Sequence, residues 1–240
     1  MRLILTTTSR RQACCCISTC SPSPIPSLNM PLSTHALTVK GGCNCGTIRY
    51  SVSIPPLEER VVHPYSTATP PVRLPFVCTD HCNDCRRATG SVLPAWLCTP
   101  ASMVSASIAP KSTATLPSDP AKRKDTPAEV RGGWVPASEV FTPGSESANG
   151  RDESFLQSYD SSEGSRRFWC GRCGTNLAYV AWPMPAGWPE ISDIVLGTVD
   201  REDLEREEMR PERQIVSYLN VLHLCTLTFD FALFVKTLGP

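Results

Sequence analysis

Residues 80–91 read Asp-His-Cys-Asn-Asp-Cys-Arg-Arg-Ala-Thr-Gly-Ser, and we expect the fold to be arranged around them. They contain a C-x-x-C pair, Cys82 and Cys85, and a third sulfur, Cys78, lies just upstream. Asp80 and His81 stand between Cys78 and the pair. Thiolate, carboxylate and imidazole groups are the ligands that zinc takes in proteins. Their density here indicates a metal ion.

Two more cysteine pairs lie to either side of this stretch, Cys43 and Cys45 before it and Cys170 and Cys173 after it. Glycines flank both pairs, and glycine accepts the positive φ of a tight turn that brings two sulfurs together. Four sulfurs complete a tetrahedral zinc site, which normally stabilises a fold and does no chemistry. Four arginines lie close in sequence and are expected to balance the charge of this site: Arg49, Arg166, Arg167 and Arg172.

Cys82 and Cys85 are then left over and need at least one more ligand. The local candidates are Cys78, Asp80 and His81. A zinc site with only three protein ligands keeps one position open, as catalytic zinc does. The alternative is that Cys82 and Cys85 belong to the structural site and another pair is idle, but three pairs exceed one tetrahedron. Ligand counting therefore favours two sites.

Alternating apolar and polar residues predict short strands over residues 37–40 and 47–54, joined by the glycine-rich C-x-C turn. Further strands are expected to end near Val77 and to span 91–98, 166–169, 177–180 and 191–199. Asp200 is predicted to cap a short helix over residues 201–209. The fold class is mostly β.

Composition sets the expected boundaries. Residues 1–35 are predicted to be a disordered leader, and residues 36–235 one zinc-binding domain. Within it, about 105–152 is rich in Pro, Ser, Thr, Ala and Lys and is expected to be a disordered insertion. Residues 215–235 are mostly apolar but carry polar interruptions, so a core element is favoured over a membrane anchor.

The whole-chain totals bear on compartment and partners. Thirteen cysteines in 240 residues, an odd number unevenly spaced, suit zinc in a reducing compartment, and we expect a cytoplasmic protein. The net charge is zero, which gives no reason to expect nucleic acid or an anionic membrane as a partner. The oligomeric state stays open.

Three blocks carry a family resemblance: residues 41–50 with C-x-C, residues 80–91, and residues 166–175 with C-G-x-C-G. In this order they resemble the glutathione-dependent formaldehyde-activating enzyme family, which includes centromere protein V. The resemblance covers about residues 36–100 and 154–216. It implies a mostly antiparallel β-tent pinned by zinc, with Cys43, Cys45, Cys170 and Cys173 binding the structural ion.

The resemblance also implies a second, catalytic zinc held by C-x-C-x-x-C, and here the chain departs from the pattern. Cys82 and Cys85 match, but Asp80 stands where the first cysteine belongs. Asp80 can ligate zinc directly, since carboxylates do so at about 2.0–2.2 Å. Alternatively Cys78 swings in, or the site no longer binds zinc. His81 is interpreted as a neighbour of the site.

The family reaction joins the sulfur of glutathione to formaldehyde, and the enzyme class is carbon–sulfur lyase. Arg86 and Arg87 are candidates for binding glutathione carboxylates, although solvated surface arginines are common. Thr89 and Ser91 offer hydroxyl donors or simply form the turn into the next strand. The alternative function is a non-catalytic zinc-stabilised binding module, because a fold does not fix a function.

Overall fold

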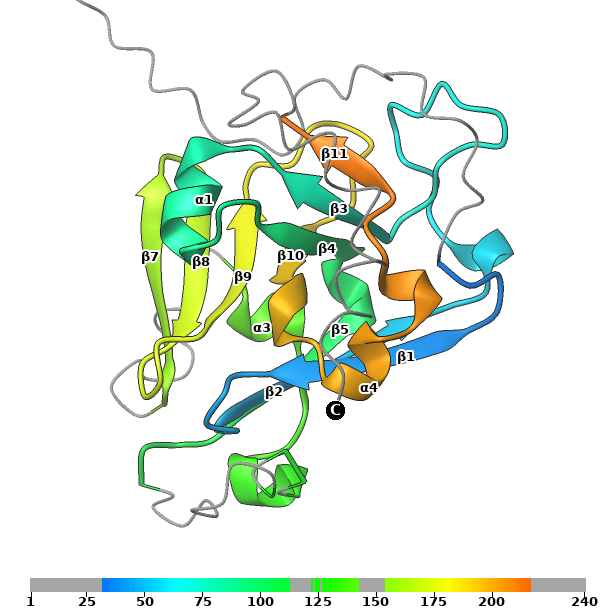
Figure 1. The fold of residues 1–240 in the computed structure, drawn as a ribbon. Helices are drawn as coiled ribbons and strands as arrows, with labels where there is room; N and C mark the ends of the chain where they lie inside the picture. Colours follow the sequence, from blue (N-terminus) through cyan, green and yellow to red (C-terminus); the bar gives the residue numbers. More distant parts are fainter. Residues whose placement is uncertain (1–31, 113–121, 123, 126, 143–153, 217–240) are drawn as a thin grey trace, which may run out of the picture.

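The computed structural model describes residues 32–112, 122, 124–125, 127–142 and 154–216, and these are mostly β (Figure 1), as the sequence predicts. A smaller sheet has the strand order β1 (Leu37–Gly42), β2 (Ile48–Ile54), β5 (Val104–Ile108) and β6 (Val135–Pro136). A larger sheet has the order β11 (Arg213–Ile215), β3 (Phe76–Asp80), β4 (Ala95–Pro100), β10 (Ile191–Val195), β9 (Asn176–Ala181), β8 (Ser165–Cys170) and β7 (Leu156–Ser162).

Neighbouring strands are antiparallel with one exception, since β11 pairs parallel with β3. The helices are short: α1 (Asn83–Thr89), α3 (Ala137–Val140) and α4 (Arg201–Leu204). Single 3₁₀ turns connect several elements: η1 (Leu57–Glu59), η2 (Ala101–Met103), η3 (Ala128–Arg131), η4 (Leu196–Thr198) and η5 (Glu207–Met209). Among the described residues, no helix is long and apolar enough to cross a membrane.

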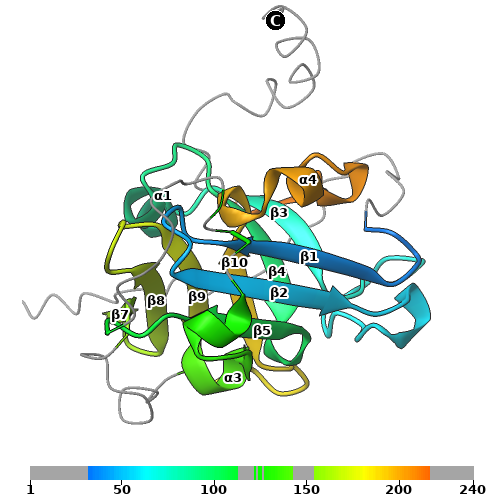
Figure 2. The ribbon, with the colours of Figure 1, turned by 90° about the horizontal axis from the view of Figure 1, so that it is seen from below.

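The main core lies between the two sheets, and Figure 2 shows β1 and β2 running across the strands of the larger sheet. Successive side chains of a strand point to opposite faces. Val77, Leu97 and Ile194 are thus directed to the inner face of the larger sheet, where they join Val39 and Ile48 of the smaller sheet in one buried cluster. This packing fixes which residues of β3, β4 and β10 face outward.

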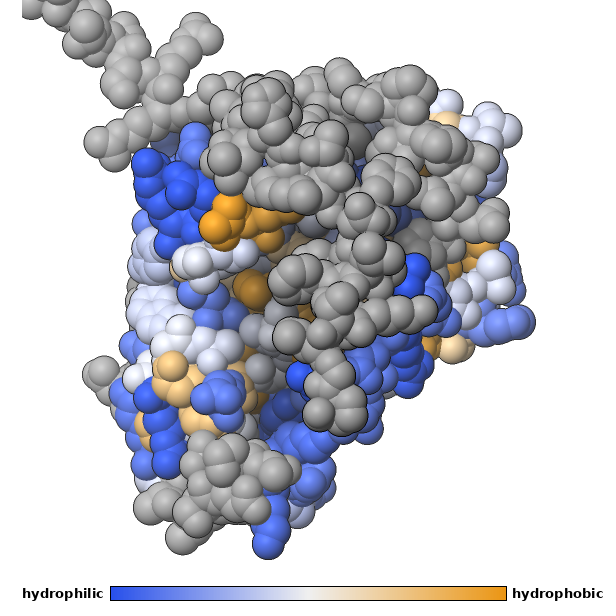
Figure 3. Space-filling view, viewed as in Figure 1, coloured by the Kyte–Doolittle hydropathy of each residue, from blue (hydrophilic) through white to orange (hydrophobic). Residues whose placement is uncertain are grey.

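The outer face of the larger sheet has a second buried cluster of its own. Phe76 and Cys78 of β3, Trp96 and Cys98 of β4, and Tyr179 of β9 belong to it. Asp80 lies an even number of residues from Phe76 and Cys78, so its side chain points to the same outer face of the sheet. The stretch 80–91 therefore begins on this face. Residues of α1 continue from there, and Figure 3 shows a strongly hydrophilic surface over this helix, where Asn83, Asp84 and Arg87 are exposed.

Two predicted boundaries are wrong where the structure describes them. Residues 105–108, placed in the insertion, belong to β5 in the middle of the smaller sheet, and residues 127–142 form η3, β6 and α3. Ala137, Val140 and Phe141 enter the main core, because three apolar side chains suffice to anchor a short segment there. Leu32, placed in the leader, is only 2% exposed and also packs in this core.

Asp200 is the N-cap residue of α4, as predicted, and its carbonyl accepts from the amides of Asp203 and Leu204. Its side chain makes no cap hydrogen bond, because the carboxylate instead accepts hydrogen bonds from Arg49 of β2. The helix ends at Leu204 rather than near Met209. Residues 1–31 and 217–240 lie outside the described residues, and with them most of the predicted leader and nearly all of the apolar segment predicted over 215–235.

Candidate metal centres

Two groups of side chains among the described residues are placed to hold a metal ion. One joins Cys43, Cys45, Cys170 and Cys173, and the other joins Asp80, Cys82 and Cys85. Within each group the ligand atoms all lie within 4.8 Å of one another. We call them the four-cysteine group and the Asp80 group. The sequence predicted the four-cysteine group as a set, and for Cys82 and Cys85 it left Asp80, Cys78 and His81 open as the third ligand. The structure brings Asp80 to that pair.

The four-cysteine group forms where two turns meet. Cys43 and Cys45 lie in the turn between β1 and β2, while Cys170 ends β8 and Cys173 follows in the next turn. The Sγ atoms of Cys43 and Cys45 are 3.5 Å apart, and those of Cys45 and Cys170 are 3.6 Å apart. Sulfurs around tetrahedral zinc are separated by about 3.8 Å, given Zn–S bonds of about 2.3 Å. The four cysteines therefore fit a closed zinc site.

Glycine conformation and backbone hydrogen bonds set up both turns. Gly46 and Gly174 follow their cysteines with φ of 75°, which a residue with a side chain rarely adopts. The amide of Ile48 donates to Cys43 Sγ at 3.3 Å. Donors aimed at a sulfur stabilise its thiolate form, which is the form that binds metal.

One polar residue beside these sulfurs was not singled out from the sequence. The hydroxyl of buried Thr47 lies 3.4, 3.1 and 3.3 Å from the sulfurs of Cys43, Cys45 and Cys170. Hydrogen bonding from Cys170 lowers the pKa of Cys43 to about 4, and that contact raises the pKa of Cys170. A thiolate beside a thiol is an arrangement in which a metal ion can replace the proton.

The arginines expected beside these four sulfurs have other partners. Arg49 pairs with Asp200, and Arg166 pairs with Asp160 at 2.6 Å. The guanidinium of Arg172 lies 5.6 Å from the ring of Phe155. Arg167 contacts the Asp80 group instead, so its predicted assignment is wrong. Strand alternation explains the error, since Arg167 points to the opposite face of the sheet from its neighbour Phe168.

A different cation acts on the four-cysteine group. Burial and, secondly, the charge of Arg49 lower the pKa of Arg131, and the charge of Cys43 opposes this shift. Arg131 lies in η3 and is 3% exposed, and its Nε donates to Ser107 Oγ at 3.2 Å. Sequence reasoning missed Arg131 because the composition of residues 105–152 is typical of a disordered insertion.

The Asp80 group forms where β3 runs into α1. Asp80 is the last residue of β3, Cys82 is the N-cap residue of α1, and Cys85 lies in the first turn of that helix. Asp80 Oδ1 accepts a hydrogen bond from the Cys82 amide at 2.8 Å, and Oδ2 accepts one from Trp96 Nε1 at 3.1 Å. A carboxylate oxygen has two lone pairs, so each oxygen keeps one for a metal.

Cys78 does not belong to this group. Its Sγ atom lies 3.6 Å from Cys98 Sγ on β4, and both side chains are buried. Asp80 is therefore the third potential ligand that the structure places with Cys82 and Cys85. His81 also turns away, since its Nε2 lies 3.1 Å from Gln214 Oε1 of β11. That position agrees with its interpretation as a neighbour.

Metal binding by the Asp80 group depends on the redox state of Cys82. Cys82 is disulfide-bonded, whereas Cys85 is a free thiol. A sulfur in a disulfide offers no thiolate to a metal. The Asp80 group can therefore offer three ligands only when Cys82 is reduced, which is the state expected in a reducing compartment.

Arg167 supplies a positive charge to the Asp80 group. Its Nη2 donates to Cys85 Sγ at 3.3 Å, and its guanidinium lies 4.8 Å from the ring centroid of Tyr179. The side chain is almost wholly buried, at 3% exposure. Burial and, secondly, the negative charge of Asp80 raise the pKa of Cys85, and Arg167 opposes both effects. A buried cation beside two acidic ligands favours their charged forms.

The predicted glutathione-binding residues lie along α1 and just after it. Arg87 is exposed, while Arg86 is half-buried and its Nη2 lies 3.5 Å from Asn83 Oδ1. The Thr89 hydroxyl donates to the carbonyl of Cys85 at 2.9 Å, and the Ser91 amide donates to Thr89 Oγ1 at 3.3 Å. Thr89 thus holds the end of the helix, and its hydroxyl hydrogen is already engaged.

Comparison with known proteins adds no relative. No protein-family model matches the chain, and no curated protein matches it. The case for a function therefore rests on the two groups of ligands.

Proposed function

We propose that the protein is a zinc-dependent carbon–sulfur lyase of the glutathione-dependent formaldehyde-activating type, working in the cytoplasm on thiol adducts of small aldehydes or related electrophiles. The observation that carries this proposal is the coexistence of a four-ligand group with a separate three-ligand group. Four protein ligands saturate zinc, whereas three leave a position for substrate. The four-cysteine group would then pin the fold, and the Asp80 group would serve the reaction.

Zinc bound to three protein ligands can hold a substrate thiol as its thiolate or polarise a carbonyl oxygen. The chain's own residues would prepare the site for it. Trp96 and the Cys82 amide orient the Asp80 carboxylate through its two oxygens. Hydrogen bonds from neighbouring groups to a metal ligand fix the position of the ligand and tune its basicity. Arg167 offsets the negative charge that two thiolates and one carboxylate bring to a divalent ion.

The proposed reaction needs no oxidant or reductant. A carbon–sulfur bond forms between the thiol of glutathione and the carbonyl carbon, and the thiol proton is transferred to the carbonyl oxygen as a hydroxyl group. The reverse step breaks that bond and returns thiol and aldehyde. Arg86 and Arg87, next to Cys85 on α1, are the proposed partners of the glutathione carboxylates. Ser91 is the proposed hydroxyl donor, and Thr89, whose hydroxyl hydrogen is engaged by Cys85, is a proposed contact only as an acceptor.

Metal analysis of the reduced full-length protein, paired with a formaldehyde–glutathione assay, tests the proposal. We expect about two zinc ions per chain, given one closed and one open site, and formation of S-(hydroxymethyl)glutathione. Asp80→Ala should lose the second ion and the activity. Cys78→Ser is the matched control, and it should keep both because Cys78 pairs with Cys98. Retention of the second ion by Asp80→Ala together with its loss in Cys78→Ser would exclude Asp80 as a ligand.

The second candidate function is a zinc-stabilised binding module without catalysis. Two observations favour it: a carboxylate replaces the expected third cysteine, and Cys82 is disulfide-bonded. This alternative expects about one zinc ion per reduced chain, a count that Cys82→Ser leaves unchanged. It also expects no turnover with any aldehyde. The two candidates therefore differ in both measurements.

A further inference from the structure

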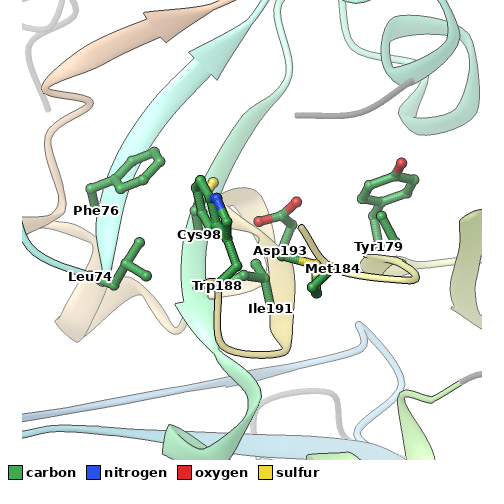
Figure 4. Close-up of a pocket in the computed structure, with 9 residues that line it drawn as sticks. Leu74, Phe76, Cys98, Tyr179, Met184, Trp188, Ile191 and Asp193 are labelled. Atoms are coloured by element: carbon green, nitrogen blue, oxygen red, sulfur yellow. The ribbon is translucent and has the colours of Figure 1, made fainter. Parts of the chain in front are cut away.

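An apolar pocket opens on the outer face of the larger sheet. Figure 4 shows its lining, which comes from β3, β4, β9, β10 and the segment between β9 and β10. The apolar side chains in it include Leu74, Phe76, Tyr179, Met184, Trp188 and Ile191. The volume of its cavity is about 30 Å³. The pocket is therefore narrow and suits a slender ligand.

The pocket adjoins the Asp80 group through two of its own lining residues. The guanidinium of Arg167 lies over the ring of Tyr179, and it also donates a hydrogen bond to the sulfur of Cys85. Cys98 lies against Cys78, two residues before Asp80 on the same face of β3. The pocket and the Asp80 group are therefore neighbours on the same face of the larger sheet.

Two polar groups belong to this otherwise apolar lining. The carboxylate of Asp193, on β10 opposite Cys98 and Tyr179, lines the pocket and is 4% exposed. The indole Nε1–H of Trp188 is buried and has no hydrogen-bond partner among the described residues. A buried donor without a partner costs free energy, which a ligand that accepts its hydrogen bond would recover. One acceptor and one donor suit a ligand with a hydroxyl group, which can donate to the one and accept from the other.

The charges around the pocket argue against a cationic ligand. Asp193 alone would favour a cation, and aromatic faces attract cations too. Two arginines already lie on those faces, however, with the Arg213 guanidinium 5.1 Å from Phe76 and that of Arg167 4.8 Å from Tyr179. A third positive charge between them would be repelled. A neutral ligand is not repelled by these two arginines.

We propose that this pocket binds the short carbon chain of a neutral molecule. Resting on the proposed function, we further infer that the aldehyde handled at the Asp80 group carries such a chain, so that it is larger than formaldehyde. The apolar walls supply the binding free energy through burial of the chain. For a ligand that carries a hydroxyl group in the pocket, the Trp188 indole and Asp193 supply the polar contacts.

Direct binding tests the pocket without reference to catalysis. Butan-1-ol, butylammonium and butyrate would be titrated against the reduced, zinc-loaded full chain, with binding followed by ligand-observed NMR. The neutral alcohol should bind most tightly of the three. Tightest binding by butylammonium would overturn the inference, because it would make Asp193 the anchor of a cation site. Failure of the alcohol to bind would overturn it as well.

Two pocket variants and one matched control locate the binding. Ala181→Leu fills the pocket and should weaken butan-1-ol binding about tenfold or more, the effect of one misfitted branch in an apolar site. Ile191→Ala removes a half-buried side chain from the lining and should shift the preference of the pocket from butan-1-ol toward hexan-1-ol. Ala186→Leu makes the same change at an exposed alanine and should have no effect. Equal behaviour of all three variants would place the alcohol elsewhere.

Turnover then separates this inference from the proposed function. With glutathione present, kcat/KM for butanal should exceed that for formaldehyde, and Ala181→Leu should lower only the value for butanal. Alcohol binding without turnover of any aldehyde would support the pocket and overturn the proposed function. Turnover of formaldehyde without alcohol binding, or without any preference for the longer aldehyde, would support the function and overturn the inference about the pocket.

Discussion

Arg167 on β8 donates a hydrogen bond to the sulfur of Cys85 on α1, across a separation of 82 residues and at a distance of 3.3 Å. The contact joins the third block of the sequence to the second. It also leaves Arg167 stacked on Tyr179, a wall of the apolar pocket. The guanidinium thus contacts both a member of the Asp80 group and a residue that lines the neighbouring pocket.

The first prediction concerns this guanidinium. Arg167→Met should weaken binding of the second zinc ion about 10–100-fold, the usual cost of removing a group that supports a metal ligand. The ion in the four-cysteine group should be retained. Competition with a chromophoric chelator measures both affinities. Arg172→Met is the matched control, because Arg172 contacts Phe155 instead. An unchanged second affinity in Arg167→Met would show that the charge of Arg167 does not support that site.

The second prediction separates the roles of the two groups. Cys170→Ser should abolish folding or lower the melting temperature strongly, because this cysteine belongs to the closed site and ends a central strand. Cys85→Ser should keep the fold, monitored by circular dichroism, and lose only the second ion. Equal loss of structure in both variants would contradict the division into structural and reactive sites.

The third prediction follows from the disulfide at Cys82. Without a thiol reductant, the chain should bind about one zinc ion, and with reductant about two, because only a thiolate can ligate the metal. Zinc stoichiometry after desalting measures the difference. Cys82→Ser should bind one ion with or without reductant. A second ion bound equally well by the oxidised wild type would remove Cys82 from the ligand set.

The fourth prediction concerns His63, which packs edge-on against Trp188 at 4.6 Å between ring centroids. Burial and, secondly, the charge of Arg213 lower its pKa below the usual histidine value of 6.5. The folded state thus binds this proton less readily than the unfolded state does. The stability that neutral His63 contributes is complete above about pH 6.5 and is lost as the pH falls through the lowered pKa.

His63→Phe should therefore reduce the drop in melting temperature between pH 7 and pH 5 relative to wild type. The comparison between the two proteins cancels acid effects that both share, including release of metal. His35→Phe, at an exposed histidine, is the control and should keep the wild-type drop. Parallel pH dependences for wild type and His63→Phe would show that His63 is not responsible.

Local patterns were enough to predict much of this fold. The alternation over residues 47–54 corresponds to β2. The pairs Cys43–Cys45 and Cys170–Cys173 converge in tight turns, while Cys82 and Cys85 are brought together by the first turn of α1. Strand β5 was missed although Val104–Ile108 alternates too, since its small side chains and Pro-rich surroundings resemble a disordered segment. Contacts between residues far apart in the sequence could not be predicted either. Asp200 could cap a helix or pair with Arg49, and only the folded chain decides between them.

Strand β8 serves both candidate metal centres, one from each face of the larger sheet. Its last residue, Cys170, belongs to the four-cysteine group, and three positions earlier Arg167 reaches across to Cys85 on the other side. Two ions bound at these groups would therefore be coupled through a single backbone segment. We expect the chain to load them in order: an ion in the four-cysteine group would fix β8, and Arg167 would then already be positioned beside the second site.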